Sequence, residues 1–314
     1  MFGMSGRLSA IDYFEKASRL GNVHAQYMLG KIYLDANGGQ ENTEKAVLWL
    51  TKAADNGSSL AQYALGKLYR DGSHVEKDME KAVTLFTLSA EQDNQYAAYA
   101  LASLYLAGEG IPRDVDAAVK WLAVSADLGN QFAQYTLAKL YITGEDIPKN
   151  IPKAVELFTK SAEQNNSFAQ YQLGKLYLLG EDVPKDIDKT VKWLTLSAEQ
   201  ENQYAQYVLG KLYLKGHEVP RDREAAVRWL TLSAEQGNIY AQFFLNHLDS
   251  LSDPSPFLAA TRLLHHLSRI FQEEQKKLPG GLGMQADSKL RRKLRQKKMA
   301  QGHAPDDHEL KQTY

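Results

Sequence analysis

The residues of this sequence with the clearest binding chemistry are aromatic rings and lysines that recur at a fixed spacing. A ring stands at every thirty-sixth residue from 96 to 240, and a lysine follows seven residues after three of these rings, on the same face of a helix. The candidate binding residues are Tyr96, Phe132, Phe168, Tyr204, Tyr240, Lys139, Lys175 and Lys211. Apolar anchors combined with positive charge suit a protein partner, as an extended peptide or an acidic segment. The alternative is that the rings pack against neighbouring repeats while the lysines only solvate the surface.

A second candidate is the strongly basic segment 287–301. Its candidate nucleic-acid-binding residues are Lys289, Arg291, Arg292, Lys293, Arg295, Lys297 and Lys298. Such a helix could bind the phosphates of DNA. Two other interpretations stay open, a solvated charged tail and contact with an acidic protein or a membrane surface.

The motifs of common enzyme classes are missing from the sequence. It contains no phosphate-binding loop, no G-x-S-x-G and no H-E-x-x-H. The absence of cysteine excludes disulfides, thiolate metal sites and cysteine nucleophiles. Carboxylates in the recurring E-D-[IV]-P loops follow the repeat register, as turn residues do. We therefore predict a protein that is not an enzyme and has no catalytic residues, no cofactor and no metal site.

Composition points to an ordinary globular chain. The 314 residues carry a net charge of −1, so no global bias indicates nucleic acid or membrane. No signal peptide is evident, and no stretch approaches the roughly 20 apolar residues of a membrane span. We predict a cytoplasmic protein that does not insert into a membrane.

The whole pattern is a 36-residue repeat without insertions. Alanine occupies 25, 61, 97, 133, 169, 205 and 241, and an aromatic ring follows each alanine two residues later. Each repeat holds two amphipathic patterns, exemplified by Ala25, Leu29 and Tyr33 and then by Ala46 and Leu50. A repeat is thus predicted to be a helical hairpin.

Capping residues and glycines support the hairpins. Asn22 and its equivalents precede each first helix, and Asn42 and its equivalents precede each second helix, as N-caps do. The glycines at 72, 108, 144, 180 and 216 are expected to end first helices in the left-handed conformation. A further glycine series at 30, 66, 174 and 210, with alanine at 102 and 138, lies inside the first helix and predicts a close helix crossing.

The motif A-x-Y-x-L-G-x-L-Y-x-x-G, read at residues 205–216, continues with Pro220, Asp222, A-V-x-W-L at 226–230 and A-E-x-G-N at 234–238. It resembles the Sel-one-like repeat family, relatives of the tetratricopeptide repeats. The resemblance implies an all-α fold, an α-solenoid in which antiparallel helix pairs form a right-handed superhelix. It also implies an adaptor whose first helices line the concave groove and bind a protein partner there.

The predicted array covers residues 1–251, with six full repeats and a half repeat at each end. Lone helices are expected at 9–20 and 239–250. The first end lacks an obvious polar cap, which leaves open a preceding segment of a longer polypeptide, an association surface, or a terminus that frays. After the array we predict a capping helix within 252–278, a linker at 279–286, the basic helix at 287–301 and a disordered tail at 302–314. The oligomeric state is not determined.

The C-terminal region carries a second resemblance. Residues 260–267, 287–293 and 302–308 are similar to the end of mobilisation relaxases of bacterial conjugative elements, without the nicking domain. This implies a setting in which the basic helix lies near DNA. Two hypotheses follow, a protein-binding scaffold and an accessory nucleic-acid-binding module of a conjugation machine.

Overall fold

The computed structural model of the chain describes residues 2–35 and 39–248. All regular secondary structure in this part of the chain is α-helix. First helices of the repeats are α2 (Val23–Asp35), α4 (Ser59–Asp71), α6 (Gln95–Ala107), α8 (Gln131–Thr143), α10 (Ser167–Leu179), α12 (Gln203–Lys215) and α14 (Ile239–Asn246). Second helices are α1 (Phe2–Arg19), α3 (Gly39–Asp55), α5 (Met79–Ala90), α7 (Val115–Asp127), α9 (Ile151–Glu163), α11 (Ile187–Glu199) and α13 (Arg223–Glu235).

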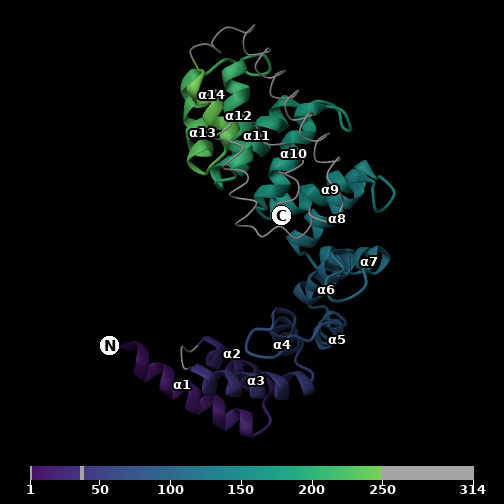
Figure 1. Cartoon of the computed structure of the whole chain (residues 1–314), viewed down its shortest axis with the longest axis vertical. Helices are drawn as coiled ribbons and strands as arrows, with labels where there is room; N and C mark the ends of the chain where they lie inside the picture. Colours follow the sequence, from purple (N-terminus) through teal and green to yellow (C-terminus); the bar gives the residue numbers. More distant parts are fainter. Residues whose placement is uncertain (1, 36–38, 249–314) are drawn as a thin grey trace, which may run out of the picture. The chain divides into compact units, whose positions relative to one another are not determined.

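The helices form the predicted all-α solenoid, in two compact units, Met1–Ala169 and Gln170–Tyr314. Within the first unit each helix from α1 to α9 contacts the next one along the chain, and α1, α2 and α3 lie side by side (Figure 1). Within the second unit α12 contacts both α13 and α14. Local pairing of sequence neighbours is the arrangement that a stack of hairpins requires.

The core of each hairpin is a crossing between a small residue and a large one. An added Cβ at Gly66 would lie 2.9 Å from ring atoms of Phe86, and one at Gly210 would lie 2.7 Å from Cγ of Leu230. Phe86 and Leu230 are completely buried. The predicted close crossing of the two helices is therefore confirmed, and a larger residue at these glycines would clash with the core.

Successive hairpins share apolar surface. In the second unit Trp229 of α13 is buried among Leu209 of its own repeat and Leu194 of the preceding repeat. In the first unit Trp121 packs against the core formed by Phe86 and Leu101. Since each repeat completes the core of its neighbour, a hairpin cannot bury its apolar side alone.

The capping predictions hold at every first helix and fail at one second helix. Asn22 accepts from the backbone N–H of Ala25 at 2.8 Å, and Ser58, Asn94, Asn130, Asn166, Asn202 and Asn238 cap in the same way. The prediction for Asn42 is wrong, because α3 begins at Gly39. An ion pair between Glu41 and Lys45, 2.6 Å, supports the additional turn.

The end helices differ from their predicted lengths. Helix α1 starts at Phe2 rather than at residue 9; no proline interrupts its N-terminal extension, and elongation of a formed helix is inexpensive. Helix α14 ends at Asn246 rather than at 250, where His247 leaves the helical conformation with φ −119°. The predicted capping helix, linker, basic helix and tail lie outside the described residues.

The turn that joins one repeat to the next requires a left-handed residue. Glycine occupies it at 21, 57, 129 and 237, but Asp93, Asn165 and Glu201 have φ of 59°, 64° and 62°. An added Cβ at those four glycines meets no atom within 4 Å, so space is available and the strain is purely conformational. Glutamate has no local hydrogen-bonding advantage in this conformation, which costs an L-residue roughly 1–2 kcal/mol.

We predict that Glu201→Gly stabilises the protein by about 1 kcal/mol, since glycine adopts the left-handed conformation without strain. The measurement is the midpoint of guanidinium unfolding. Glu199→Gly is the matched control, because Glu199 is also exposed but is helical, and glycine there should lower stability by about 1 kcal/mol. Equal destabilisation by both substitutions would show that the turn is not strained.

Candidate partner-binding surface

In each unit the second residues of the first helices from α4 onward make up what we call the aromatic stripe: Leu60, Tyr96, Phe132 and Phe168 in the first unit, and Tyr204 and Tyr240 in the second. Helix α2 has His24 at this position. The helix caps fix the backbone of the stripe. Asn130 Oδ1, for example, accepts from the N–H groups of Phe132 at 2.9 Å and of Ala133 at 3.0 Å. The cap that starts each helix thus also holds the stripe residue in place.

Each stripe ring packs on a tyrosine of the preceding repeat. In the first unit the ring centroids of Tyr99 and Phe132 lie 6.2 Å apart, as do those of Tyr63 and Tyr96. In the second unit the distance is 6.1 Å for Tyr171 and Tyr204 and 5.8 Å for Tyr207 and Tyr240. These are favourable tilted aromatic pairs.

Packing and exposure coexist in the stripe. Tyr96 keeps 53% of its surface exposed, Phe132 48% and Leu60 47%, although each contacts the preceding repeat or lies beside it. Phe168, Tyr204 and Tyr240 are intermediate in exposure. The two alternatives stated for these rings are therefore compatible, because one edge of a ring packs while the other remains available.

Lysines lie over the tyrosines on which the stripe residues pack. The Nζ atoms of Lys67 and Lys139 lie 5.7 Å from the ring centroids of Tyr63 and Tyr135, and Lys211 Nζ lies 5.8 Å from that of Tyr207. Lys175 occupies the equivalent position in α10. Each of the first three lysines thus lies over a tyrosine on which a stripe ring of the next repeat packs. Their role in binding a partner stays a prediction.

Amide pairs next to the stripe, each with one buried and one exposed partner, were not foreseen from the sequence. Gln134 is only 4% exposed; its Nε2 donates to the carbonyl of Ala126 in the preceding repeat at 3.1 Å, and its Oε1 accepts from Nε2 of the exposed Gln164, in its own hairpin, at 2.8 Å. The same side-chain bond joins Asn56 to Gln26, Gln92 to Gln62, Gln200 to Gln170 and Gln236 to Gln206. The side-chain pair closes each hairpin, and the bond from the buried glutamine to a backbone carbonyl ties that hairpin to the preceding one.

The signal for these pairs is present within the single chain. Ala98 occupies the position that is equivalent to Gln26 and Gln134 in other repeats. Leu128, thirty residues after it, occupies the position of their glutamine or asparagine partners. Ala98 is fully buried. The joint replacement of both polar partners avoids leaving a buried amide without a partner, which would cost about 1–3 kcal/mol.

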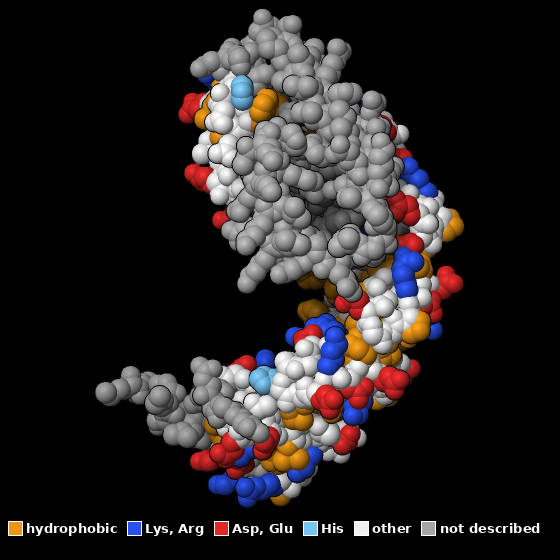
Figure 2. Space-filling view, in the orientation of Figure 1, with side chains coloured by type: hydrophobic (Ala, Val, Ile, Leu, Met, Phe, Trp, Pro, Cys, Tyr) orange, Lys and Arg blue, Asp and Glu red, His pale blue; other side chains and the backbone are white. Residues whose placement is uncertain are grey.

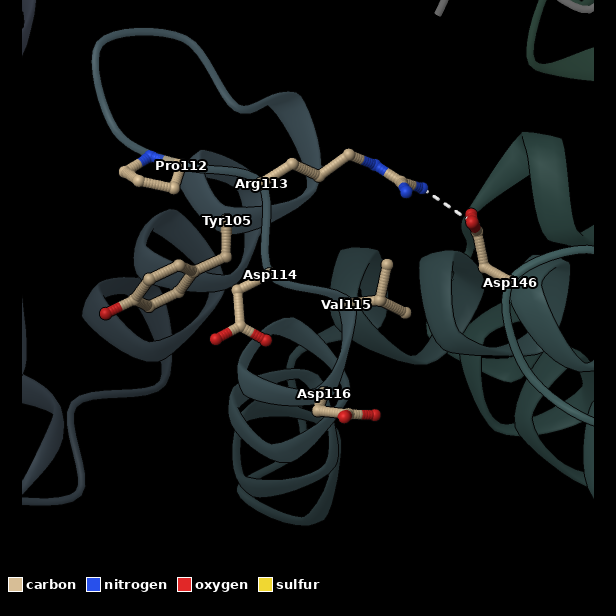
Figure 3. A pocket seen from close by; sticks show the side chains of 7 residues that line it. All are labelled: Tyr105, Pro112, Arg113, Asp114, Val115, Asp116 and Asp146. Atoms are coloured by element: carbon tan, nitrogen blue, oxygen red, sulfur yellow. Dashed lines mark hydrogen bonds and ion pairs between the residues drawn. The ribbon is translucent and has the colours of Figure 1, made fainter.

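A shallow hollow lies in the first unit between two interhelical loops (Figure 3). Arg113 reaches across it to Asp146, with 2.6 Å between Nη2 and Oδ1, and Asp114 caps α7 through the N–H of Ala117. The equivalent ion pair in the second unit joins Lys185 and Glu218 at 2.5 Å. These carboxylates stabilise loops and a helix start, in keeping with their register in the repeat.

Few ionisable groups have altered pKa values. Burial raises the pKa of the Tyr63 phenol, and a hydrogen bond from Lys185 lowers the pKa of the Glu218 carboxyl. Figure 2 shows acidic and basic side chains mixed with hydrophobic ones over the visible face of the N-terminal half. Neither pattern resembles the paired, shifted carboxylates of a general acid–base site.

Within the described residues, neither a cluster of metal ligands nor a membrane-spanning helix is found. In that part of the chain no group of three or more His, Asp or Glu side chains is placed to hold a metal ion. None of the helices within 2–35 and 39–248 is long and apolar enough to cross a membrane. The basic residues from Lys289 to Lys298 lie outside the described residues, so their role stays a prediction.

Comparison with known proteins identifies the repeat. The model described as "Sel1 repeat" matches residues 7–22, 23–58, 59–94, 95–130, 131–166, 167–202 and 203–238. The crystal structure of a Sel1 repeat protein from Oxalobacter formigenes is similar with 29% identity and a TM-score of 0.64, over 72% of this chain and 92% of that one. A protective antigen of uropathogenic Escherichia coli has 33% identity and a TM-score of 0.45, over 74% and 58% of the respective chains. No curated protein matches the sequence.

The glutamine pairs predict a specific coupling. Gln164→Leu should destabilise the protein by about 1–3 kcal/mol, because it leaves the buried Oε1 of Gln134 without its partner. Gln134→Ala should also destabilise the protein, because it removes the bond to the Ala126 carbonyl, whereas the exposed Gln164 can then bond to water. The double variant reproduces the Ala98–Leu128 pair of the same chain, so its cost should be smaller than the sum by roughly 1 kcal/mol or more. The measurement is a double-mutant cycle on unfolding midpoints, and strict additivity would contradict the coupling.

Proposed function

Because the chain belongs to the Sel1 repeat family, we propose that it is a non-enzymatic scaffold that binds a partner protein along the aromatic stripe. The observation that carries the proposal is the exposure of rings whose backbone is fixed by the helix caps. Phe132, half exposed, sits one residue inside α8 with its N–H bonded to Asn130. Soluble proteins expose large rings in rows chiefly where another molecule covers them.

Rigidity favours this surface as a binding site. The stripe residues lie on helices, and their rings rest against Tyr63, Tyr99 and Tyr135 in the first unit. A ring that is already ordered loses little conformational entropy on binding, so more of the contact energy appears as affinity. Aromatic residues are also the commonest hot spots of protein interfaces.

Recurrence in register suggests how a partner is read. The same ring position repeats in every hairpin from α6 to α14, and a lysine accompanies it at 139, 175 and 211. Within one unit, a linear segment of a partner protein therefore places successive side chains against successive repeats. We place the scaffold in the cytoplasm, in keeping with a sequence that lacks cysteine.

We predict that Phe132→Ala combined with Phe168→Ala weakens binding to a partner by at least about thirtyfold, since two anchors of about 1 kcal/mol or more are removed. Partners are first identified with the purified chain, and the dissociation constant is then measured by calorimetry for the original chain and the variant. Helicity by circular dichroism should remain unchanged, because both rings are only partly buried.

Leu48→Ala combined with Leu88→Ala is the matched control. Both leucines belong to the same unit, lie on second helices and are 50% and 44% exposed, so the control removes a similar apolar surface away from the stripe. The proposal fails if the control weakens binding as much as the stripe variant. It also fails if the stripe variant binds as tightly as the original chain.

A further inference from the structure

Acidic residues are absent from the first helices of the repeats from α6 onward, although α2 and α4 end in Asp35 and Asp71. The first helices α6, α8, α10, α12 and α14 contain neither aspartate nor glutamate. Second helices carry them regularly, for example Asp188 and Glu199 in α11 and Glu224 and Glu235 in α13. The surface that bears the aromatic stripe therefore has only positive formal charge on these helices.

Positive charge without negative charge is found on the first helices of the second unit. There, α10 and α12 present Lys175, Lys211 and Lys215, all partly exposed. The first helices of the first unit carry Lys31, Lys67, Arg70 and Lys139 but also Asp35 and Asp71. A second unit that carries three ammonium groups and no carboxylate on its first helices is electrostatically suited to an anionic ligand.

Both stripe residues of the second unit are tyrosines. Tyr204 and Tyr240 pack on Tyr171 and Tyr207, whereas the first-unit stripe contains Leu60, Tyr96, Phe132 and Phe168. Tyrosine combines an apolar ring with a hydroxyl group that can hydrogen bond. Lys211 lies over the Tyr207 ring, so charge and phenol stand together at one point of the surface.

One carboxylate beyond these helices takes part in an ion pair between two loops. Glu218, in the loop after α12, is within electrostatic range of Lys215 and His217, and its Oε1 accepts from Lys185 Nζ at 2.5 Å.

We propose that the second-unit stripe binds a short acidic segment of the partner protein, with lysines contacting carboxylates and tyrosine rings contacting the intervening apolar side chains. This inference rests on the proposed scaffold function and adds the chemistry of the ligand. Complementary charge selects the partner, and the rings supply most of the affinity.

A peptide fits this surface better than a nucleic acid. Proteins that bind nucleic acids commonly neutralise six or more phosphates, whereas α10 and α12 offer three lysines. The acidic residues of α11 and α13 and of the loops would repel a long polyanion that extends past the stripe. A segment with a few carboxylates avoids that repulsion.

The test is a selection of random twelve-residue peptides on the full-length chain, followed by affinity measurements with the enriched peptides. Sequences enriched on the original chain should be rich in Asp and Glu with interspersed apolar residues. Lys175→Glu combined with Lys211→Glu should weaken those peptides by about tenfold or more at moderate salt. Lys192→Glu combined with Arg228→Glu makes the same charge change on α11 and α13 and should leave binding nearly unchanged.

Three outcomes would overturn the inference: peptides without an acidic preference, equal affinity in both charge-reversal variants, or tighter binding of a single-stranded DNA twelve-mer than of the selected peptides. Tyr204→Ala combined with Tyr240→Ala separates the two proposals. If the tyrosine variant loses the selected peptides but the lysine variant keeps them, the scaffold surface stands and its acidic specificity falls. If neither variant loses them, both proposals fail for this unit.

Discussion

The contact on which this structure depends is the crossing of two helices at a residue with almost no side chain. Gly30, Gly66, Gly174 and Gly210 allow Leu50, Phe86, Leu194 and Leu230 to approach to a distance that no Cβ would permit. A glycine inside a helix costs about 1 kcal/mol relative to alanine, so its recurrence indicates a larger gain from close packing. At Ala102 and Ala138 the same crossing accommodates one methyl group, and both alanines are fully buried.

Stacking of these hairpins creates the candidate site as a by-product of the core. Each repeat supplies an apolar face to its neighbour, and the tyrosine that completes this face leaves one side of its ring for the stripe residue of the next repeat. Buried amides then fix the spacing, because Gln134 bonds to both Ala126 and Gln164. Folding and binding surface are thus built from the same inter-repeat contacts, and this links recognition to the intact array.

Charge is distributed according to the same geometry. Second helices and loops carry both signs and use them in caps and in ion pairs such as Arg113–Asp146, while first helices from α6 onward have lost their acidic residues. Exposed ion pairs contribute little to stability, typically below about 1 kcal/mol. The segregation of charge therefore has little structural explanation, and it is better explained by what the first-helix surface contacts.

The sequence by itself determined the hairpin repeat, the caps at Asn130 and its equivalents, the left-handed glycines and the tight crossing, because each depends on residues within one or two helical turns or on a strict period. It did not determine the start of α3 at Gly39, where tertiary contacts and the Glu41–Lys45 pair override a local capping residue. Only the tertiary structure decided that Phe132 is half exposed while it packs on Tyr99, and that Gln134 meets Gln164. Exposure depends on the distance between successive hairpins, and the amide pair depends on how the two helices of one hairpin meet. A repeat period specifies the order of helices along the chain but neither of these geometries.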